Sequence, residues 1–160
     1  MGVFDKSLCD CCVCPMQCVL EQLIDIPVLI FRRIGSSILT TISEVDNFIA
    51  FTDQGKFPIC NITAITIPDG ATLNLKPIKK NTGECFCCED PITNLASTLI
   101  DQVVEMNVIG IASSFEISIV DVGEGIILTG NPVGTEVLPI SSCAITRINS
   151  INQQQINSQN

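Results

Sequence analysis

The chain has 160 residues, of which 46% are hydrophobic, and a formal net charge of −9 with no histidine, tryptophan or tyrosine. This length allows one ordinary domain or two small ones, and the apolar content excludes a disordered body. The acidic balance argues against nucleic-acid binding, because affinity for phosphate backbones depends on lysine and arginine. Without histidine, no set of nucleophile, base and orienting residue can be assembled, so we expect a non-enzymatic protein with no catalytic residues.

The charge is unevenly distributed along the chain. Residues 1–80 contain eight acids and seven bases, whereas residues 81–160 contain nine acids and Arg147 as the one base. A subunit with unlike ends favours head-to-tail association with copies of itself. The simpler interpretation is that the acidity serves solubility alone.

One pattern of residues occurs twice in the chain. Residues 9–25 and residues 87–101 share a cysteine pair, a proline and a closing Leu-Ile-Asp. Two more pairs of similar stretches follow in the same order, namely 43–52 with 118–129 and 58–67 with 139–148. Such an internal repeat predicts a duplicated structural unit, so we expect two tandem copies of one small domain.

In chain order, the first predicted element is a short helix over residues 15–25. Proline suits the first helical position, and Val19, Leu20, Leu23 and Ile24 form an apolar face. Five short strands are then predicted, at 28–32, 38–45, 47–52, 57–59 and 61–67. Asp69-Gly70 is a hairpin signal, which predicts that residues 71–75 pair back against 64–67.

The second copy repeats this order. Asp90 is the predicted N-cap of a helix that opens at Pro91. Strands are predicted at 103–109, 114–120, 125–129, 136–140 and 143–148. The fold class expected from both copies is therefore mainly β with short helices.

These elements resemble the Sm-like (Hfq-type) small β-barrel family. Residues 23–28 (LIDIPV) resemble its helix-to-strand junction, residues 44–51 (EVDNFIAF) its first motif and residues 58–62 (PICNI) its second. The resemblance implies two tandem Sm-like or SH3-like five-stranded small barrels, each preceded by a short helix. Ala50 and Cys60-Asn61 differ from the residues that RNA-binding members carry near these places. An Sm-like RNA-binding protein is accordingly one of the alternative functions.

The resemblance also divides the chain. We expect the following segments: 1–14, a cysteine-rich N-terminal connector arm; 15–75, the first barrel; 76–90, a linker with a cysteine cluster; 91–148, the second barrel; and 149–160, a polar Asn/Gln-rich tail.

Residues 11–16 (CCVCPM) resemble the cysteine pattern of small spore-coat proteins of Bacillus-type bacteria, and the paired N-terminal cysteines are similar to the connector arms of endospore appendage subunits. This implies a structural, self-assembling subunit of a disulfide-cross-linked coat, exosporium or fibre. Residues 1–7 lack a basic region and an apolar core, so we expect no signal peptide. Synthesis in the mother-cell cytoplasm would be followed by oxidation after release. The expected partners are copies of the chain and other spore-surface proteins, with no nucleic acid and no membrane.

Ten cysteines carry the predicted chemistry. Adjacent cysteines point in different directions, which favours bonds to two partners, and the start of a helix favours the reactive thiolate. Cys60 and Cys143 lie in predicted strands, and each is interpreted either as a small buried hydrophobe or as half of a disulfide. The residues expected to cross-link are Cys9, Cys11, Cys12, Cys14, Cys18, Cys85, Cys87 and Cys88.

Metal binding is the alternative chemistry. Cys11-x-x-Cys14 and Cys85-x-x-Cys88 have the spacing of zinc ligands, and together they would form a four-thiolate site in a cytoplasmic binding module. One zinc ion would leave four of the crowded cysteines unused. We therefore expect no resident cofactor, with zinc as the alternative. A thioredoxin-like redox site would need a βαβ arrangement, which the pattern does not predict.

Overall fold

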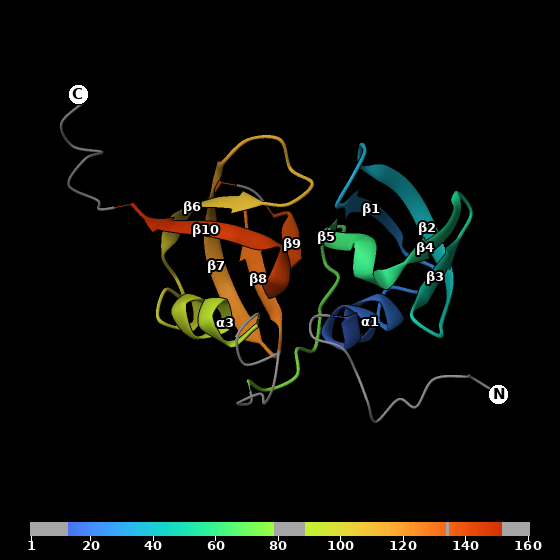
Figure 1. Cartoon of the computed structure of the whole chain (residues 1–160), viewed down its shortest axis with the longest axis horizontal. Helices are drawn as coiled ribbons and strands as arrows, with labels where there is room; N and C mark the ends of the chain where they lie inside the picture. The colour runs from blue at the N-terminus through green and yellow to red at the C-terminus, as the bar shows by residue number, and fades with distance from the viewer. Residues whose placement is uncertain (1–12, 79–88, 134, 152–160) are drawn as a thin grey trace.

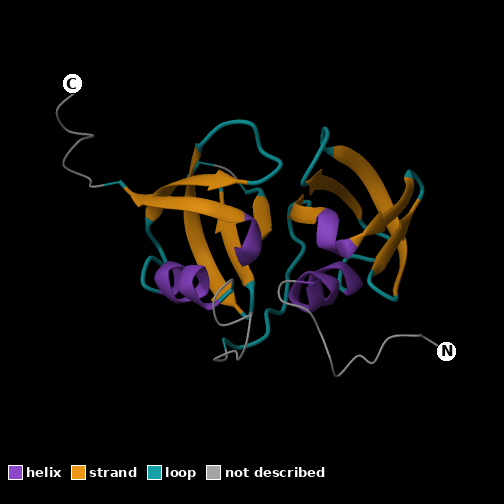
Figure 2. Ribbon diagram, viewed as in Figure 1, coloured by secondary structure: helices purple, strands orange, loops and turns teal. Residues whose placement is uncertain are grey.

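The computed structural model describes residues 13–78, 89–133 and 135–151, and it is mainly β (Figures 1 and 2). The first half, residues 13–78, contains α1 Val13–Glu21, β1 Pro27–Arg32, β2 Ile38–Asp46, β3 Ile49–Thr52, β4 Gly55–Pro58, the 3₁₀ turn η1 Ile59–Asn61 and β5 Ile62–Thr66. The second half, residues 89–151, contains α3 Asp90–Ser97, β6 Val103–Val108, β7 Phe115–Gly123, β8 Ile126–Gly130, β9 Val137–Ser141, η2 Ser142–Ala144 and β10 Ile145–Ser150. This order confirms the predicted class.

The repeated Leu-Ile-Asp marks the same backbone turn in both halves. Asp25 and Asp101 have φ angles of 64° and 65°, in the left-handed region that few non-glycine residues adopt. The backbone N–H of Asp25 donates to the carbonyl of Ile42, and that of Asp101 donates to the carbonyl of Ile119, both at 2.8 Å. The predicted first helix is therefore too long, since α1 ends at Glu21 and Asp25 directs the chain into β1.

The two 3₁₀ turns, η1 and η2, have the same backbone geometry. The residues that occupy equivalent positions in them are not the ones that the sequence comparison aligns. Pro58 precedes η1 with φ −57° and ψ 129°, and Ser141 precedes η2 with φ −62° and ψ 128°. The predicted pairing of 58–67 with 139–148 is accordingly offset by two residues. It follows that Cys60 and Cys143 occupy equivalent positions, each at the middle of its turn.

All ten strands join one antiparallel sheet in the order β10-β6-β7-β8-β9-β5-β1-β2-β3-β4. Each half therefore has the same internal order, with its fifth strand next to its first. The halves meet at the β5–β9 junction, where Ala64 lies opposite Ile140 and the N–H of Ile67 donates to the carbonyl of Val137 at 3.2 Å. The described strands form an open sheet that ends at β4 and β10, so their pairing does not establish two closed barrels.

The predicted strand at 71–75 is wrong. Gly70 does make the expected turn with φ +82°, but the residues after it form no strand. They run alongside α1 instead, where Asn74 N–H donates to Oε1 of Gln22 at 2.7 Å and Gln22 Nε2 donates to the Asn74 carbonyl at 3.1 Å. The edge of β5 that these residues were expected to cover is occupied by β9, which the hairpin signal could not indicate.

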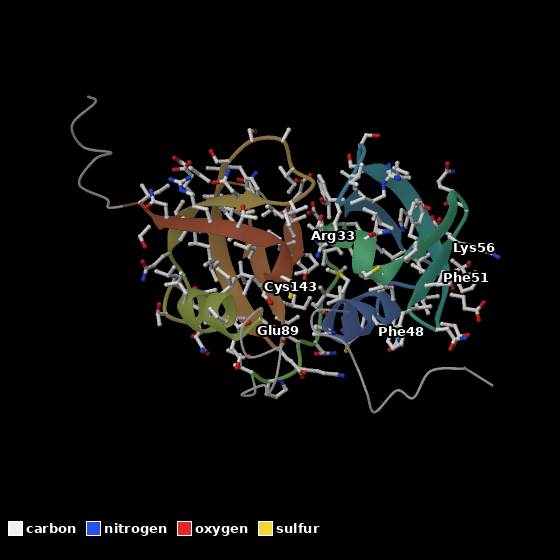
Figure 3. The ribbon with its side chains drawn as sticks, in the orientation of Figure 1. Arg33, Phe48, Phe51, Lys56, Glu89 and Cys143 are labelled. Carbon is white, nitrogen blue, oxygen red and sulfur yellow. The ribbon has the colours of Figure 1, made fainter. Side chains whose placement is uncertain are left out.

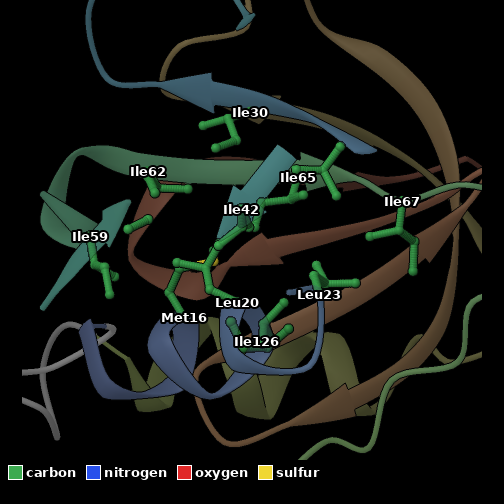
Figure 4. Packing of buried hydrophobic residues seen from close by; sticks show 13 residues of the cluster. Met16, Leu20, Leu23, Ile30, Ile42, Ile59, Ile62, Ile65, Ile67 and Ile126 are labelled. Carbon is green, nitrogen blue, oxygen red and sulfur yellow. The ribbon is translucent and has the colours of Figure 1, made fainter. Parts of the chain in front are cut away.

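The interior consists of two apolar clusters, and each takes a residue from the other half. Ile126 on β8 packs in the first cluster with Met16, Leu20 and Leu23 of the first half (Figure 4). Ala64 on β5 packs in the second cluster, among residues of the second half. This exchange across the β5–β9 junction couples the two halves energetically.

Asp53 connects the β3–β4 turn to β2, and its ionisation is expected to be visible in stability. Its carboxylate accepts hydrogen bonds from the Thr40 hydroxyl and, at 3.0 Å, from the Thr41 N–H, and these bonds lower the pKa of Asp53 below 3.8. A lowered pKa stabilises the fold above the unfolded-state value of about 3.9, and this contribution is lost as the pH falls through the folded-state value. Asp53→Asn should therefore be less stable than the wild type at pH 7. In urea unfolding, the difference in the free energy of unfolding between the two proteins should become smaller below about pH 4. A difference that does not vary with pH would contradict this account.

Candidate cross-linking site

Three cysteine side chains lie within the described residues. Cys18 on α1 is half-buried and free, and Cys60 in η1 is exposed and free. Cys143 in η2 is disulfide-bonded. Because the other two are free, the partner of Cys143 has its side chain outside the described part of the chain.

Cys60 and Cys143 were each interpreted as a buried hydrophobe or as half of a disulfide, and the structure decides between these for Cys143. Cys143 is half of a bridge rather than a buried hydrophobe. Cys60 is neither, since it is exposed and free in η1, where the Arg33 Nε donates to its carbonyl at 3.0 Å. Cys60 was not among the predicted cross-linking residues. The signal that would have identified it is its equivalence to Cys143, which the two-residue offset in the sequence match conceals.

Most of the predicted cross-linking residues fall outside the described part of the chain. This applies to Cys9, Cys11, Cys12, Cys85, Cys87 and Cys88, and Cys14 lies in α1 with its side chain not described. The four predicted zinc ligands are all in this group. Among the side chains that the structure does describe, no group of three or more Cys, Asp or Glu is placed to hold a metal ion.

The described residues next to both cysteine-rich segments meet at one point, the β7–β8 turn. Gly125 in that turn has φ +66°, and a Cβ there would lie 2.7 Å from Cγ of Pro15 and 2.9 Å from Cδ of Glu89. Pro15 follows Cys14 at the start of α1, and Glu89 follows Cys88 just before α3. The two cysteine-rich segments of the sequence are therefore attached at neighbouring points.

Cys143 belongs to the same neighbourhood. The N–H of Ser142, the residue before it, donates to the Gly125 carbonyl at 2.9 Å. Glu89 lies against the same glycine, and both Cys143 and Glu89 are labelled in Figure 3. Cys143, which is disulfide-bonded, thus follows directly on a residue that contacts the turn where both segments attach.

The start of α3 differs from its prediction. Glu89, not Asp90, is the N-cap, and it makes no side-chain hydrogen bond to the helix. The Glu89 carbonyl instead accepts from the Thr93 N–H at 3.1 Å and the Thr93 hydroxyl at 2.8 Å. The Glu89 side chain is buried against the β7–β8 turn, which explains why it does not fold back onto its own helix.

No helix of the described residues is long and apolar enough to cross a membrane. No protein-family model matches the chain, and no curated protein or solved structure is significantly similar to it.

Proposed function

We propose that this protein is a structural, self-assembling subunit of a disulfide-cross-linked spore-surface assembly, namely a coat, an exosporium or a fibre. The observation that carries the proposal is the unequal state of two equivalent cysteines. Cys143 is bonded within the chain, whereas Cys60, at the same position of the first half, is free and exposed. The cysteine of the second half is thus already in a disulfide within the chain, and the equivalent cysteine of the first half is open to a cysteine of a second chain.

The proposed subunit consists of two Sm-like small barrels, each preceded by a short helix. Three features support this finer description: the identical strand order of the halves, their separate apolar clusters, and a register shift at the same place in β5 and β10. Small units of this size gain stability from cross-links, because a disulfide restricts the unfolded chain.

The proposed location follows from the chemistry of the thiols. A reducing cytosol keeps cysteines free, so synthesis in the mother cell would deliver an uncross-linked subunit. Oxidation after release would then form the bonds between chains. The proposed partners are further copies of the chain and other spore-surface proteins, with no role for nucleic acid or membrane.

Denaturing gels test the proposal. Oxidised protein should give a ladder of multimers without reductant and a single monomer band with it. Cys60→Ser should shorten the ladder, because it removes the exposed thiol of the first half. Asn61→Ser, a change at the next exposed residue, is the matched control and should leave the ladder intact.

Two other results would change the conclusion. Monomer in both lanes would refute a cross-linked assembly. About one zinc ion per chain, with loss of the fold on chelation, would instead support the cytoplasmic module with ligands Cys11, Cys14, Cys85 and Cys88.

A further inference from the structure

One face of the sheet continues from the interior of the second half onto the outside of the first half. Ala64 on β5 packs in the second cluster, and Thr66, two residues later in the same strand, points to the same face. Thr66 lies opposite Leu29 on β1, which in turn lies opposite Leu39 on β2. Directly opposite residues of antiparallel strands share a face, so Leu29 and Leu39 extend this apolar surface. Leu39 is 70% exposed, and the surface is therefore open to solvent on β2.

A groove, here called the junction groove, follows this face across the junction of the halves. Its first part is a cavity of about 350 Å³ between the halves, and its second part is a cavity of about 460 Å³ over β1 and β2. Thr66 and Glu136 line both cavities, so the two parts adjoin. Apolar side chains in the groove include Phe31, Phe115 and Leu138 in the first part and Pro27, Leu29 and Leu39 in the second. Cavities of this size with mostly apolar walls are typical of binding sites.

The charged side chains of the junction groove are all carboxylates. Glu116 lines its first part, Asp69 lines its second part, and Glu136 lines both. Among the described residues that line the groove, none is lysine or arginine. No hydrogen bond or ion pair joins the side chain of any of these three acids to another described residue. The groove therefore offers apolar surface together with unpaired negative charge, which complements a positively charged ligand.

We propose that the junction groove binds a basic, apolar peptide segment of a different protein. Apolar side chains of the segment would cover Leu39 and its neighbours, which otherwise remain exposed. Lysine or arginine side chains of the segment would pair with Asp69, Glu116 and Glu136. The inference goes beyond the proposed function, because this binding needs no cysteine.

A second copy of the chain matches the groove less well than a basic protein does. Each copy has a net charge of −9, so a copy gains little from the negative field of the groove. Two cations of the described residues are also engaged within the chain. Lys56 Nζ lies 5.3 Å from the Phe51 ring centre (Figure 3), and Arg147 Nη1 lies 3.0 Å from Glu105 Oε1.

The groove is preformed by the contact between the halves. Its first part is bordered by the loop that follows Gly110, and a Cβ at Gly110 would lie 2.0 Å from the carbonyl oxygen of Arg32. This close approach holds the loop against β1, so binding does not require the loop to become ordered. The main chain of β5 is already paired on both sides, with β1 and with β9. Recognition in the groove therefore depends on side chains and not on the addition of a strand.

Peptides of equal apolar content and different charge test the occupant. Fluorescently labelled GKLFKLKG, GQLFQLQG and GELFELEG are titrated with the full-length protein in reductant, and fluorescence anisotropy gives each dissociation constant. The lysine peptide should bind most tightly, because its charge complements the three carboxylates. The glutamine peptide should bind more weakly, and the glutamate peptide should not bind measurably.

Two substitutions in the groove test the place of binding. Glu136→Gln should weaken binding of the lysine peptide about threefold, which is the effect of one exposed ion pair. Leu39→Ser should weaken it about tenfold, because apolar contact is lost. The matched controls are Glu44→Gln and Ile34→Ser, which change exposed residues outside both parts of the groove and should leave the affinity unchanged. Circular dichroism checks the fold, and Glu116→Gln replaces Glu136→Gln if that variant does not fold.

Three results of these titrations would overturn the proposal: equal affinity for the three peptides, equal effects of Glu136→Gln and Glu44→Gln, or no binding of any peptide. Light scattering in reductant tests a second copy as the occupant. Multimers of the wild type that Leu39→Ser abolishes would assign the groove to self-association and would likewise overturn the proposal. The oxidised ladder on denaturing gels tests the proposed function separately, since none of these variants removes a cysteine.

Discussion

Replacing Ile126 with alanine is expected to lower the free energy of unfolding by about 3 kcal/mol, because it opens a cavity in a packed core. The affected core belongs to the other half, where Ile126 packs with Met16, Leu20 and Leu23. Ile49→Ala is the matched control, since Ile49 starts the equivalent strand but is only half-buried. Ile49→Ala should lower the free energy of unfolding by about 1 kcal/mol in dilute, monomeric protein.

Urea unfolding followed by circular dichroism measures both values. We expect a single transition for the wild type and for both variants, because each cluster contains a residue from the other half. Equal losses for the two variants would contradict the packing of Ile126. Two separate transitions, with only the second half affected by the change at residue 126, would show that the halves unfold independently.

Gly110→Ala is expected to destabilise the protein by about 3 kcal/mol or more, through strain and overpacking together. Gly110 follows β6 with φ +90°, and a Cβ there would lie 2.0 Å from the carbonyl oxygen of Arg32 in the first half. The backbone of Arg32 belongs to β1 and cannot withdraw without disturbing the pairing with β5. The halves would therefore have to separate locally.

Gly70→Ala separates the contribution of backbone strain from that of overpacking. Gly70 has a similar φ of +82°, but no atom lies within 4 Å of its Cβ position. This variant should lose only about 1 kcal/mol from the left-handed conformation. Thermal or urea unfolding gives both values, and similar losses for the two variants would show that the contact between Gly110 and Arg32 is unimportant.

The sequence predicts what is encoded locally. The repeated Leu-Ile-Asp anticipates the identical turns at Asp25 and Asp101, because the residues that make each turn are neighbours in the chain. Alternating apolar residues likewise predict the strands to within a few positions. Asp69-Gly70 predicts a turn correctly, but the pairing expected beyond it fails because a distant strand, β9, competes for the same edge.

The candidate site is less visible in the sequence, because it depends on how the halves meet. Val19 and Leu95 are both apolar residues at helical spacing, and Val19 is buried because Ile126 and residues 74–76 lie against α1, whereas Leu95 is exposed. The equivalence of Cys60 and Cys143 becomes apparent only when the two 3₁₀ turns are superimposed. The bonded state of Cys143 depends on a cysteine far from it in the chain, which no local pattern encodes.

The exchange of residues between the clusters also has a consequence for synthesis. While the ribosome is still translating the segment before residue 126, the interior around Met16, Leu20 and Leu23 lacks one of its side chains. A nascent chain or a prematurely terminated product that stops short of β8 therefore carries an incomplete interior. We therefore expect the earlier residues to reach their full stability only after β8 has been made.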